Sequence, residues 1–527
     1  MTTPSDDAPL DRRLALLLAL AMFVLVVDTS FMNVSISAVV EDLGTTVSGV
    51  QSAIALEALV SAAFILIGSK VGDLVGRKRA YVLGLLAYAT GAVAMMLSQS
   101  LTTVIIFWSI IGGLGASLLL PSMQSLIHGN FIGRAQVRVY ALVGASASIA
   151  AAVGPLLGGF ITTYLSWRVA FGLEALIIVG VLSGIKLVKD VPYTGDRSID
   201  LVGAGLSALA MGGIVLGILV WQEGGEAVGA LIALGAIALL ALVRWLLHRK
   251  RAHKPVLLDP DLFRLPLFRI GVTQQMLQQI TLGSAMITLP IFLQMVLEYD
   301  AMAAGLSLAP LSLSMFALAL LAGKRSGRRR PADIVLAGFG LVVVGVIVLI
   351  PIVPRATSGW YLVLPLVIVG SGLGLLVSQL NNYTLSPIDE ERVSEAAGVN
   401  SAGGSFGLSF GLAFAGGILL AALSLGFTNQ SDASTVLSAD EKSQVSTALE
   451  DDAELMSNTR LTEVLAGQPQ DVQDEIIRIN TEVRPRALQL ALLLPLLVGV
   501  AGLINGFRMR RLPDPQPNAA AEGAAFG

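Results

Sequence analysis

Long apolar runs separated by short polar turns dominate this chain. Many of the runs reach roughly 20 residues, the length that a helix needs to cross the apolar core of a bilayer. The pattern therefore predicts an all-α polytopic membrane protein with about fourteen transmembrane helices. The expected spans are 14–40, 48–70, 80–98, 102–128, 138–163, 168–189, 201–221, 226–247, 267–297, 302–323, 332–353, 358–384, 395–424 and 485–508.

Composition supports this prediction and excludes several classes of site. Of the 527 residues, 54% are hydrophobic and 13% are charged, whereas soluble domains carry about 25% charged residues. The chain has no cysteine, which rules out disulfides and thiolate metal sites. Its three histidines, His128, His248 and His253, lie near expected helix ends, so we expect no metal and no cofactor. Residues 1–13 lack the basic region of a cleaved signal peptide, so we expect the first span to be retained.

Basic residues predict the orientation in the membrane. They collect in alternate turns and in both tails, and a single alternating phase fits every turn. Lys and Arg favour the cytoplasmic side, so we expect both termini to be cytoplasmic in a multi-pass protein of the cell membrane. The basic turns and tails hold Arg12, Arg13, Arg77 to Arg79, Arg134, Arg138, Lys186, Lys189, Arg249 to Arg251, Lys324, Arg325, Arg328 to Arg330, Arg508, Arg510 and Arg511.

A basic turn follows the second span at 66–79, and another follows the tenth span at 320–330. This internal repeat predicts two parallel six-helix bundles, with the seventh and eighth spans inserted between them. The expected divisions are 1–190 for the first bundle, 191–264 for the inserted helices with their linkers, and 265–527 for the second bundle. Transporters with such repeats bind substrate between the halves, near the midplane of the membrane.

Residues 425–484 form an acidic segment of soluble character before the last span. Ser438 and Glu441 have the spacing of a capping box, and 438–450, 457–466 and 470–481 are expected to be short amphipathic helices. This extracellular insert is either a small helical cap or spacer, or a lid or docking site over the outer mouth.

Three acidic residues fall within the expected spans. Asp28 and Glu57 are in the middle of the first and second spans, where ionisable side chains usually line an aqueous cavity or a proton path. Either carboxyl group could exchange a proton or pair with a cationic substrate. Glu174 lies near the outer end of the sixth span and either reaches the membrane interface or joins the other two acids.

Several motifs occur in order at the expected helix ends. They comprise Asp28, Thr29, Asn33 and Val34 in the first span; Asp73, Gly76, Arg77 and Lys78 in the first basic turn; Gly113, Gly115 and Pro121 in the fourth span; Gly154, Pro155, Gly158 and Gly159 in the fifth; and Leu289, Pro290, Gly305 and Pro310 in the second half. This series resembles the fourteen-helix drug:proton antiporter family of the major facilitator superfamily, and it covers most of the chain.

The resemblance implies a major facilitator fold that works by alternating access. It makes Asp73 and Arg77 part of a charge clasp that holds one conformation shut, helped by the attraction of an acid to a helix N-terminus. It makes the fifth-helix glycines a tightly packed and pliable contact between the halves. The family usually has an arginine tied to proton coupling in the fourth helix, where this chain has Ser109.

Polar and aromatic residues in the spans could line an amphipathic cavity, which would suit an apolar substrate with a few polar groups. The alternative is that they only make hydrogen bonds between helices. The candidates are Asn33, Trp108, Gln275, Gln279, Phe292, Gln294, Gln379, Asn382 and Asn400.

Together these features predict a secondary transporter that exports hydrophobic or amphipathic small molecules, such as antibiotics, antiseptics or metabolites, by proton antiport. Its expected partners are the substrate, protons and membrane lipids; we expect a monomer and no nucleic acid. One alternative is an exporter of lipids or lipid-like molecules that is not strictly proton-coupled. Another is a membrane sensor or scaffold that uses the insert. No phosphate-binding loop and no catalytic constellation occurs in the sequence, so neither ATP-driven pumping nor an enzyme is expected.

Overall fold

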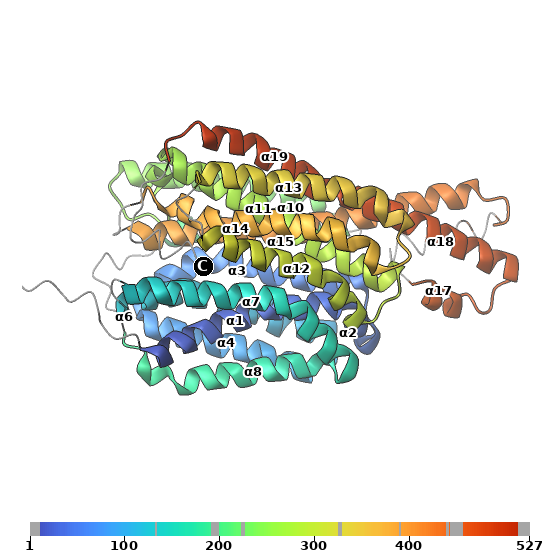
Figure 1. The fold of residues 1–527 in the computed structure, drawn as a ribbon, viewed down its shortest axis with the longest axis horizontal. Coiled ribbons are helices and arrows are strands. Elements are labelled where there is room, and N and C mark those ends of the chain that lie inside the picture. The colour runs from blue at the N-terminus through green and yellow to red at the C-terminus, as the bar shows by residue number, and fades with distance from the viewer. Residues whose placement is uncertain are drawn as a thin grey trace, which may run out of the picture.

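The computed structural model describes residues 11–131, 134–190, 200–222, 227–324, 329–388, 392–438, 442 and 457–514. Within these ranges every regular element is a helix, and 14 segments are long and apolar enough to cross a membrane. The long helices lie side by side along the long axis of the molecule (Figure 1). The prediction of an all-α polytopic protein with fourteen spans is confirmed.

The first bundle contains six spans. They are α1 (Arg12–Val34), α3 (Val47–Val75), α4 (Arg77–Leu97), the π-helical η1 (Val104–Gly112) continued by α6 (Gly113–Asn130), α7 (Arg134–Tyr164) and α8 (Trp167–Ser183). The short helices α2 (Ile36–Leu43), α5 (Leu101–Thr103) and η2 (Ile185–Leu187) lie between or after them. Gly76 alone separates α3 from α4, with a φ of 100° that favours glycine, so this residue makes the tight turn possible.

The second bundle repeats this arrangement. Its spans are α11 (Pro266–Ile291) continued by the π-helical η4 (Phe292–Val296), α12 (Ala301–Lys324), α13 (Pro331–Ile352), α14 (Val363–Leu385), α15 (Val393–Ala433), and α18 (Gln470–Ala491) continued by α19 (Leu493–Arg510). The short helices are η3 (Pro260–Arg264), η5 (Val353–Arg355), η6 (Gly359–Leu362) and α17 (Asn458–Val464). In the first bundle α1 packs on α7 and α8, and in the second α11 packs on α15 and α19. Likewise, α4 packs on α6 and α8 as α13 packs on α14 and α19.

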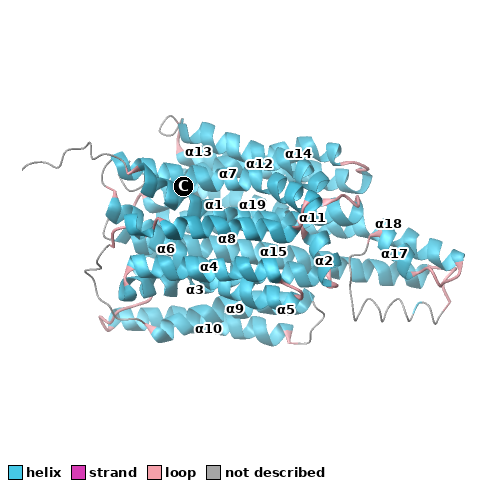
Figure 2. Ribbon diagram, turned by 90° about the horizontal axis from the view of Figure 1, so that it is seen from below, coloured by secondary structure: helices cyan, strands magenta, loops and turns pink. Residues whose placement is uncertain are grey.

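Two further spans, α9 (Leu201–Gln222) and α10 (Val228–Arg251), come between the bundles in the sequence. Helix α9 packs against α3 and α15, one helix from each bundle, and α10 packs against α9. Figure 2 shows α10 at the edge of the molecule, outside α9. The inserted pair therefore flanks one seam between the bundles.

The bundles meet along two helix pairs, α3 with α15 and α7 with α12. Small residues allow close backbone approach in the second pair. A Cβ atom on Gly159 of α7 would lie 2.5 Å from the carbonyl oxygen of Ala301, and one on Gly305 of α12 would lie 2.2 Å from that of Pro155. The fifth-helix glycines thus lie partly at the contact between the halves.

Both described chain ends, the start of α1 and the end of α19, lie at one end of the molecule, here called the terminal end (Figure 1). Helices α17 and α18 project from the opposite end, here called the insert end. The insert differs from the prediction in two ways. Helix α15 continues to Ala433, beyond the expected limit of 424, and α18 runs from Gln470 into the membrane rather than ending near 481. Helix α17 lies within the expected 457–466, whereas most of 438–450 lies outside the described residues.

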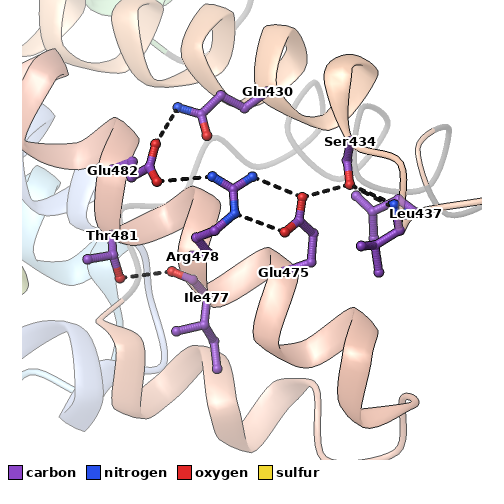
Figure 3. A network of polar contacts seen from close by, with 9 residues as sticks. Gln430, Ser434, Leu437, Glu475, Ile477, Arg478, Thr481 and Glu482 are labelled. Atoms are coloured by element: carbon purple, nitrogen blue, oxygen red, sulfur yellow. Dashed lines mark hydrogen bonds and ion pairs between the residues drawn. The ribbon is translucent and has the colours of Figure 1, made fainter.

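Polar contacts explain why both helices extend beyond the apolar core (Figure 3). Arg478 of α18 makes ion pairs with Glu475 at 2.9 Å and with Glu482 at 3.0 Å. Ser434, directly after α15, donates to Glu475 at 2.7 Å. These contacts satisfy the polar faces of α15 and α18 outside the apolar spans and hold the two helix ends together.

Candidate functional site

A buried acidic residue, Asp28, is held by two side chains from other helices of the first bundle. Asp28 lies on α1 and has no exposed surface. The hydroxyl of Tyr88, on α4, donates to Asp28 Oδ2 at 2.5 Å. The indole Nε1 of Trp108, on η1, lies 3.0 Å from Oδ1 and 2.9 Å from Oδ2. Trp108 lies in a π-helical stretch, a distortion that is frequent at functional sites.

The other two acids lie in the same bundle interior. Glu57 on α3 is 8% exposed and Glu174 on α8 is 2% exposed, so both side chains are buried in the first bundle, as Asp28 is. Neither carboxyl oxygen of Glu174 has a hydrogen-bond partner among the described residues. Of the two interpretations of Glu174, the one in which it reaches the membrane interface is wrong, because α8 buries this side chain in the interior of the first bundle. The three acids form one cluster, here called the acidic cluster.

The side chains that donate to the acidic cluster are neutral, and no buried base lies beside it among the described residues. Among the described residues, Arg484 is the sole buried basic side chain, and it belongs to α18 of the second bundle. Ser109, at the position of the family's arginine, donates its hydroxyl to the backbone oxygen of Ala53 at 2.7 Å. Several carboxylates without a cation in an apolar interior repel one another strongly. The arrangement can therefore hold protons, and its charge depends on how many it holds.

A small cavity of about 80 Å³ lies between the two bundles. Its lining is mostly apolar, with polar atoms from Ser30, Asn33 and Ser312. The Oδ1 atom of Asn33 is buried without a partner among the described residues, which leaves an acceptor available at the cavity. The lining residues are Ser30, Asn33, Val34, Ala151, Pro155, Leu282, Ala285, Met286, Leu289, Pro290, Leu308, Leu311, Ser312 and Met315.

Of the residues that the sequence suggested as lining a substrate cavity, Asn33 alone lines this one, together with Pro155 of the fifth-helix motif. Trp108 belongs to the acidic cluster, and Phe292 is buried in the apolar core. Gln275 and Gln279 face Gly404 of α15, and Asn400 donates to Asn381 at 2.7 Å. The remaining two lie on α14, where Gln379 is buried and bonded to Ser378, and Asn382 is half-buried.

Gln294 joins the two bundles. Ser37 of α2 donates its backbone N–H and its hydroxyl to Gln294 Oε1 at 2.9 and 2.8 Å. Gln294 Nε2 in turn donates to the backbone oxygen of Asn33 at 3.2 Å. Close by, Met302 of α12 donates its backbone N–H to Thr163 of α7 at 3.0 Å. These bonds close the insert end of the seam between the bundles.

The first basic turn binds the segment that follows the sixth span. The backbone N–H of Lys78 donates to Asp190 at 3.0 Å, and its ammonium donates to the carbonyl of Val188 at 2.7 Å. The Asp190 carboxylate thus caps the start of α4, where the helix dipole favours an anion. The side chain of Asp73 lies outside the described residues, so its part in a clasp stays a prediction.

The fifth-helix motif has two faces. A Cβ on Gly154 would lie 2.5 Å from that of Ser30, and one on Gly158 would lie 2.8 Å from a methyl of Val34, both on α1. Gly159 faces α12 of the other bundle instead. The motif therefore packs α7 simultaneously within its own bundle and across the seam.

Sequence reasoning missed Tyr88, Asp190, Ser312 and Arg484 as site or contact residues. Tyr88 is 60 residues from Asp28, and nothing near it in the sequence marks its hydroxyl as a partner. Arg484 had a usable signal, since it is a basic residue at the predicted start of the last span, on the side that is otherwise poor in Lys and Arg.

Comparisons with known proteins agree with this architecture. The chain is 25% identical over 399 residues to the "Probable actinorhodin transporter" of Streptomyces coelicolor, covering 74% of this chain and 69% of the relative. It is 26% identical over 412 residues to the "Multidrug resistance protein Stp" of Mycobacterium tuberculosis, covering 77% and 75%. The fold resembles an inward-facing, unoccupied bacterial homologue of the human lysosomal transporter Spinster, with a TM-score of 0.62, 11% identity, and coverage of 97% and 100%.

A family model also matches the chain. The profile described as "Major Facilitator Superfamily" matches residues 18–412, which run from the first span into α15. The match covers most of the chain and includes the acidic cluster and the Gln294 bridge. The protein therefore belongs to the major facilitator superfamily of membrane transporters.

Proposed function

We propose that this transporter exports hydrophobic or amphipathic small molecules in exchange for protons. The observation that carries the proposal is the acidic cluster, in which Asp28, Glu57 and Glu174 are buried together without a basic neighbour among the described residues. Ionisable groups at such depth are costly and are typical of proton relays. Loading and releasing protons changes the charge inside the first bundle and so biases its packing.

The substrate class is supported by the cavity and by the relatives. The cavity between the bundles is lined mainly by aliphatic side chains, with Asn33 and two serines as polar groups. At about 80 Å³ it is much smaller than the roughly 300–1,000 Å³ of sites for drug-sized ligands. Substrate binding therefore needs the bundles to separate. The names of two relatives, a multidrug resistance protein and a probable actinorhodin transporter, support export of small molecules.

Movement of the bundles follows from the same contacts. We propose that 1–190 and 265–527 move as two units, with 191–264 as a flanking pair of spans. The hydrogen bonds through Gln294 and Thr163 join these units at the insert end. This supports a state that is closed at the insert end, which must open there to release substrate.

The proposed orientation places both termini in the cytoplasm of a cell-membrane protein. At the terminal end the helix ends carry Lys78, Arg138 and Arg249, whereas the insert end carries Glu41 and Glu298. This charge distribution obeys the preference of Lys and Arg for the cytoplasmic side.

The decisive test uses purified protein in liposomes with an imposed proton gradient, with ethidium as the transported probe. We expect transport to stop with an uncoupler and to fall roughly 100-fold in at least one of Asp28→Asn, Glu57→Gln and Glu174→Gln. Glu41→Gln, an exposed acid on α2, is the matched control and should transport normally. Transport that survives the uncoupler and all three substitutions would show that the cluster does not couple protons.

Export of lipids or lipid-like molecules without strict proton coupling is a second candidate. Ser109 favours lipid export, because it stands where the family has an arginine tied to proton coupling. Here Ser109 instead joins η1 to α3 through its hydrogen bond to Ala53. A fluorescent phospholipid in the same liposomes separates the two functions. Lipid movement that ignores the gradient, with no ethidium transport, would favour lipid export.

A further inference from the structure

The outer face of the inserted helices carries a groove of about 580 Å³. One wall is Leu206 of α9, and the remainder is α10, including Ile237, Leu240 and Trp245. Helix α10 has the smallest buried share of the fourteen spans, so this face is turned toward the surrounding lipid. Ile237 and Leu240 are 64% and 61% exposed, as expected of side chains that contact acyl chains.

The polarity of this face changes along α10. Arg244, His248 and Arg251 follow the apolar residues at helical spacing, so all three project from the same side of the helix. Arg244 lies seven residues before the end of α10, which is roughly 10 Å into the span. The exposed face therefore has an apolar half toward the membrane centre and a basic half toward the terminal end.

The basic half is not neutralised by the protein. Arg244, His248 and Arg251 are exposed, and their side chains make no ion pair among the described residues. Asp200, the residue directly before α9, accepts from Trp245 Nε1 at 2.9 Å and from the backbone N–H of Gly203 at 3.0 Å. Asp200 also lies 3.7 Å from Arg249, which comes one helical turn after Trp245 and does not line the groove.

We propose that this groove is a binding site for an anionic phospholipid of the leaflet at the terminal end. The phosphate group would lie against Arg244 and His248, and an acyl chain would cover Leu240 and Ile237. Basic pockets beside membrane helices recognise such head groups, and each cation near the surface strengthens binding. Trp245 lines the groove between its apolar and basic halves.

A purely topological role for these residues predicts a different pattern. Basic side chains that only fix orientation need no groove and no alignment with an apolar face. Here the cations are aligned with an apolar strip and no acidic side chain lines the described groove. This combination fits a single amphipathic anion, whose charged head group would meet the basic half of the groove and whose acyl chain would meet the apolar half.

Native mass spectrometry of the full-length protein tests the site, with phosphatidylglycerol and phosphatidylcholine of identical acyl chains. We expect the wild type to retain phosphatidylglycerol preferentially, and Arg244→Gln to weaken that retention about fivefold. The triple variant Arg244→Gln, His248→Gln, Arg251→Gln should show no preference between the two lipids. Arg508→Gln removes an exposed charge from the same end of α19, away from the groove, and should retain the wild-type preference.

Fluorescence quenching locates the bound lipid. Phosphatidylglycerol with brominated acyl chains should quench the wild type more than Trp245→Phe, because Trp245 lines the groove. Equal retention of the two lipids by the wild type would overturn the proposal. So would a loss in Arg508→Gln as large as that in Arg244→Gln, or quenching that is unchanged in Trp245→Phe.

Discussion

Trp108 and Asp28 are joined by an indole nitrogen that lies within 3.0 Å of both carboxylate oxygens. The two residues belong to different spans, and the contact fixes the rotation of η1 relative to α1. Hydrogen bonds to a charged or buried carboxyl group contribute about 1.5–3 kcal/mol. The pair thus links the π-helical segment to the acid that we propose exchanges protons.

Trp108→Phe should lower thermal stability and slow proton-coupled transport, because it removes the donor and keeps most of the ring. The expected loss of unfolding free energy is about 1–2 kcal/mol, since Tyr88 still donates to Asp28. Differential scanning fluorimetry and liposome transport measure the two effects. Trp360→Phe, at an 84% exposed position, is the control. Equal effects of the two substitutions would argue against a specific role for the indole.

Gly305→Ala should disturb the contact between α7 and α12. The added Cβ would lie 2.2 Å from the backbone oxygen of Pro155, so one helix must shift. Overpacking of this kind costs about 1–3 kcal/mol, and transport should fall because the insert end no longer closes properly. Gly180→Ala, where a Cβ meets nothing within 4 Å, is the matched control and should behave as wild type. Normal transport by Gly305→Ala would mean that the close contact between α7 and α12 is not needed to close the insert end.

The spans and the buried acids could be predicted from the sequence, because a long apolar run marks a segment that crosses the membrane, and an acid within it must lie deep in the span. Asp28 and Glu57 stand out as ionisable groups within apolar runs. The direction in which a helix presents each residue could not be predicted. The position of Glu174 along its span left two interpretations open, the membrane interface or the bundle interior, and the structure shows it buried in the bundle.

The limits of the insert were predicted less well than the spans. Pro485 marks the predicted start of the last span, and prolines usually interrupt helices. The structure shows α18 running through Pro485, with Arg484 buried and bonded beside it. Contacts between residues far apart in the sequence stabilise this helix, and such contacts cannot be predicted from the neighbouring residues alone.

Gln294→Leu should loosen the insert end. It removes both bonds from Ser37 and the bond to Asn33, which together join η4 to the first bundle. The chain has no cysteine, so Asn33→Cys introduces a single thiol at the cavity. We expect a membrane-impermeant maleimide, added at the insert end, to label this thiol faster when Gln294→Leu is present.

The matched control is Gln489→Leu, which removes a bond of similar length, 2.7 Å to Ile350, within the second bundle. It should leave labelling of Asn33→Cys unchanged. Identical labelling rates with and without Gln294→Leu would show that these bonds do not hold the insert end shut.

Arg484 fastens the insert to the second bundle. Its guanidinium donates to the backbone oxygen of Met295 on η4 at 2.5 Å and to Asn458 on α17 at 2.6 Å. Arg484→Met should therefore lower the free energy of unfolding by about 2–3 kcal/mol, because it leaves buried acceptors unpaired. Limited proteolysis should cut near α17 sooner in this variant.

Arg478→Met is the control for Arg484→Met, since Arg478 is an exposed arginine on the same helix whose ion pairs are open to solvent. We expect little change in melting temperature or proteolysis from it, because exposed ion pairs contribute little. Transport discriminates between the roles of the insert. If the insert is a cap or spacer, Arg484→Met should still transport ethidium when it is folded. If the insert is the functional part of a sensor, Arg484→Met should abolish function while Asp28→Asn leaves it intact, and that outcome would contradict the proposed export function.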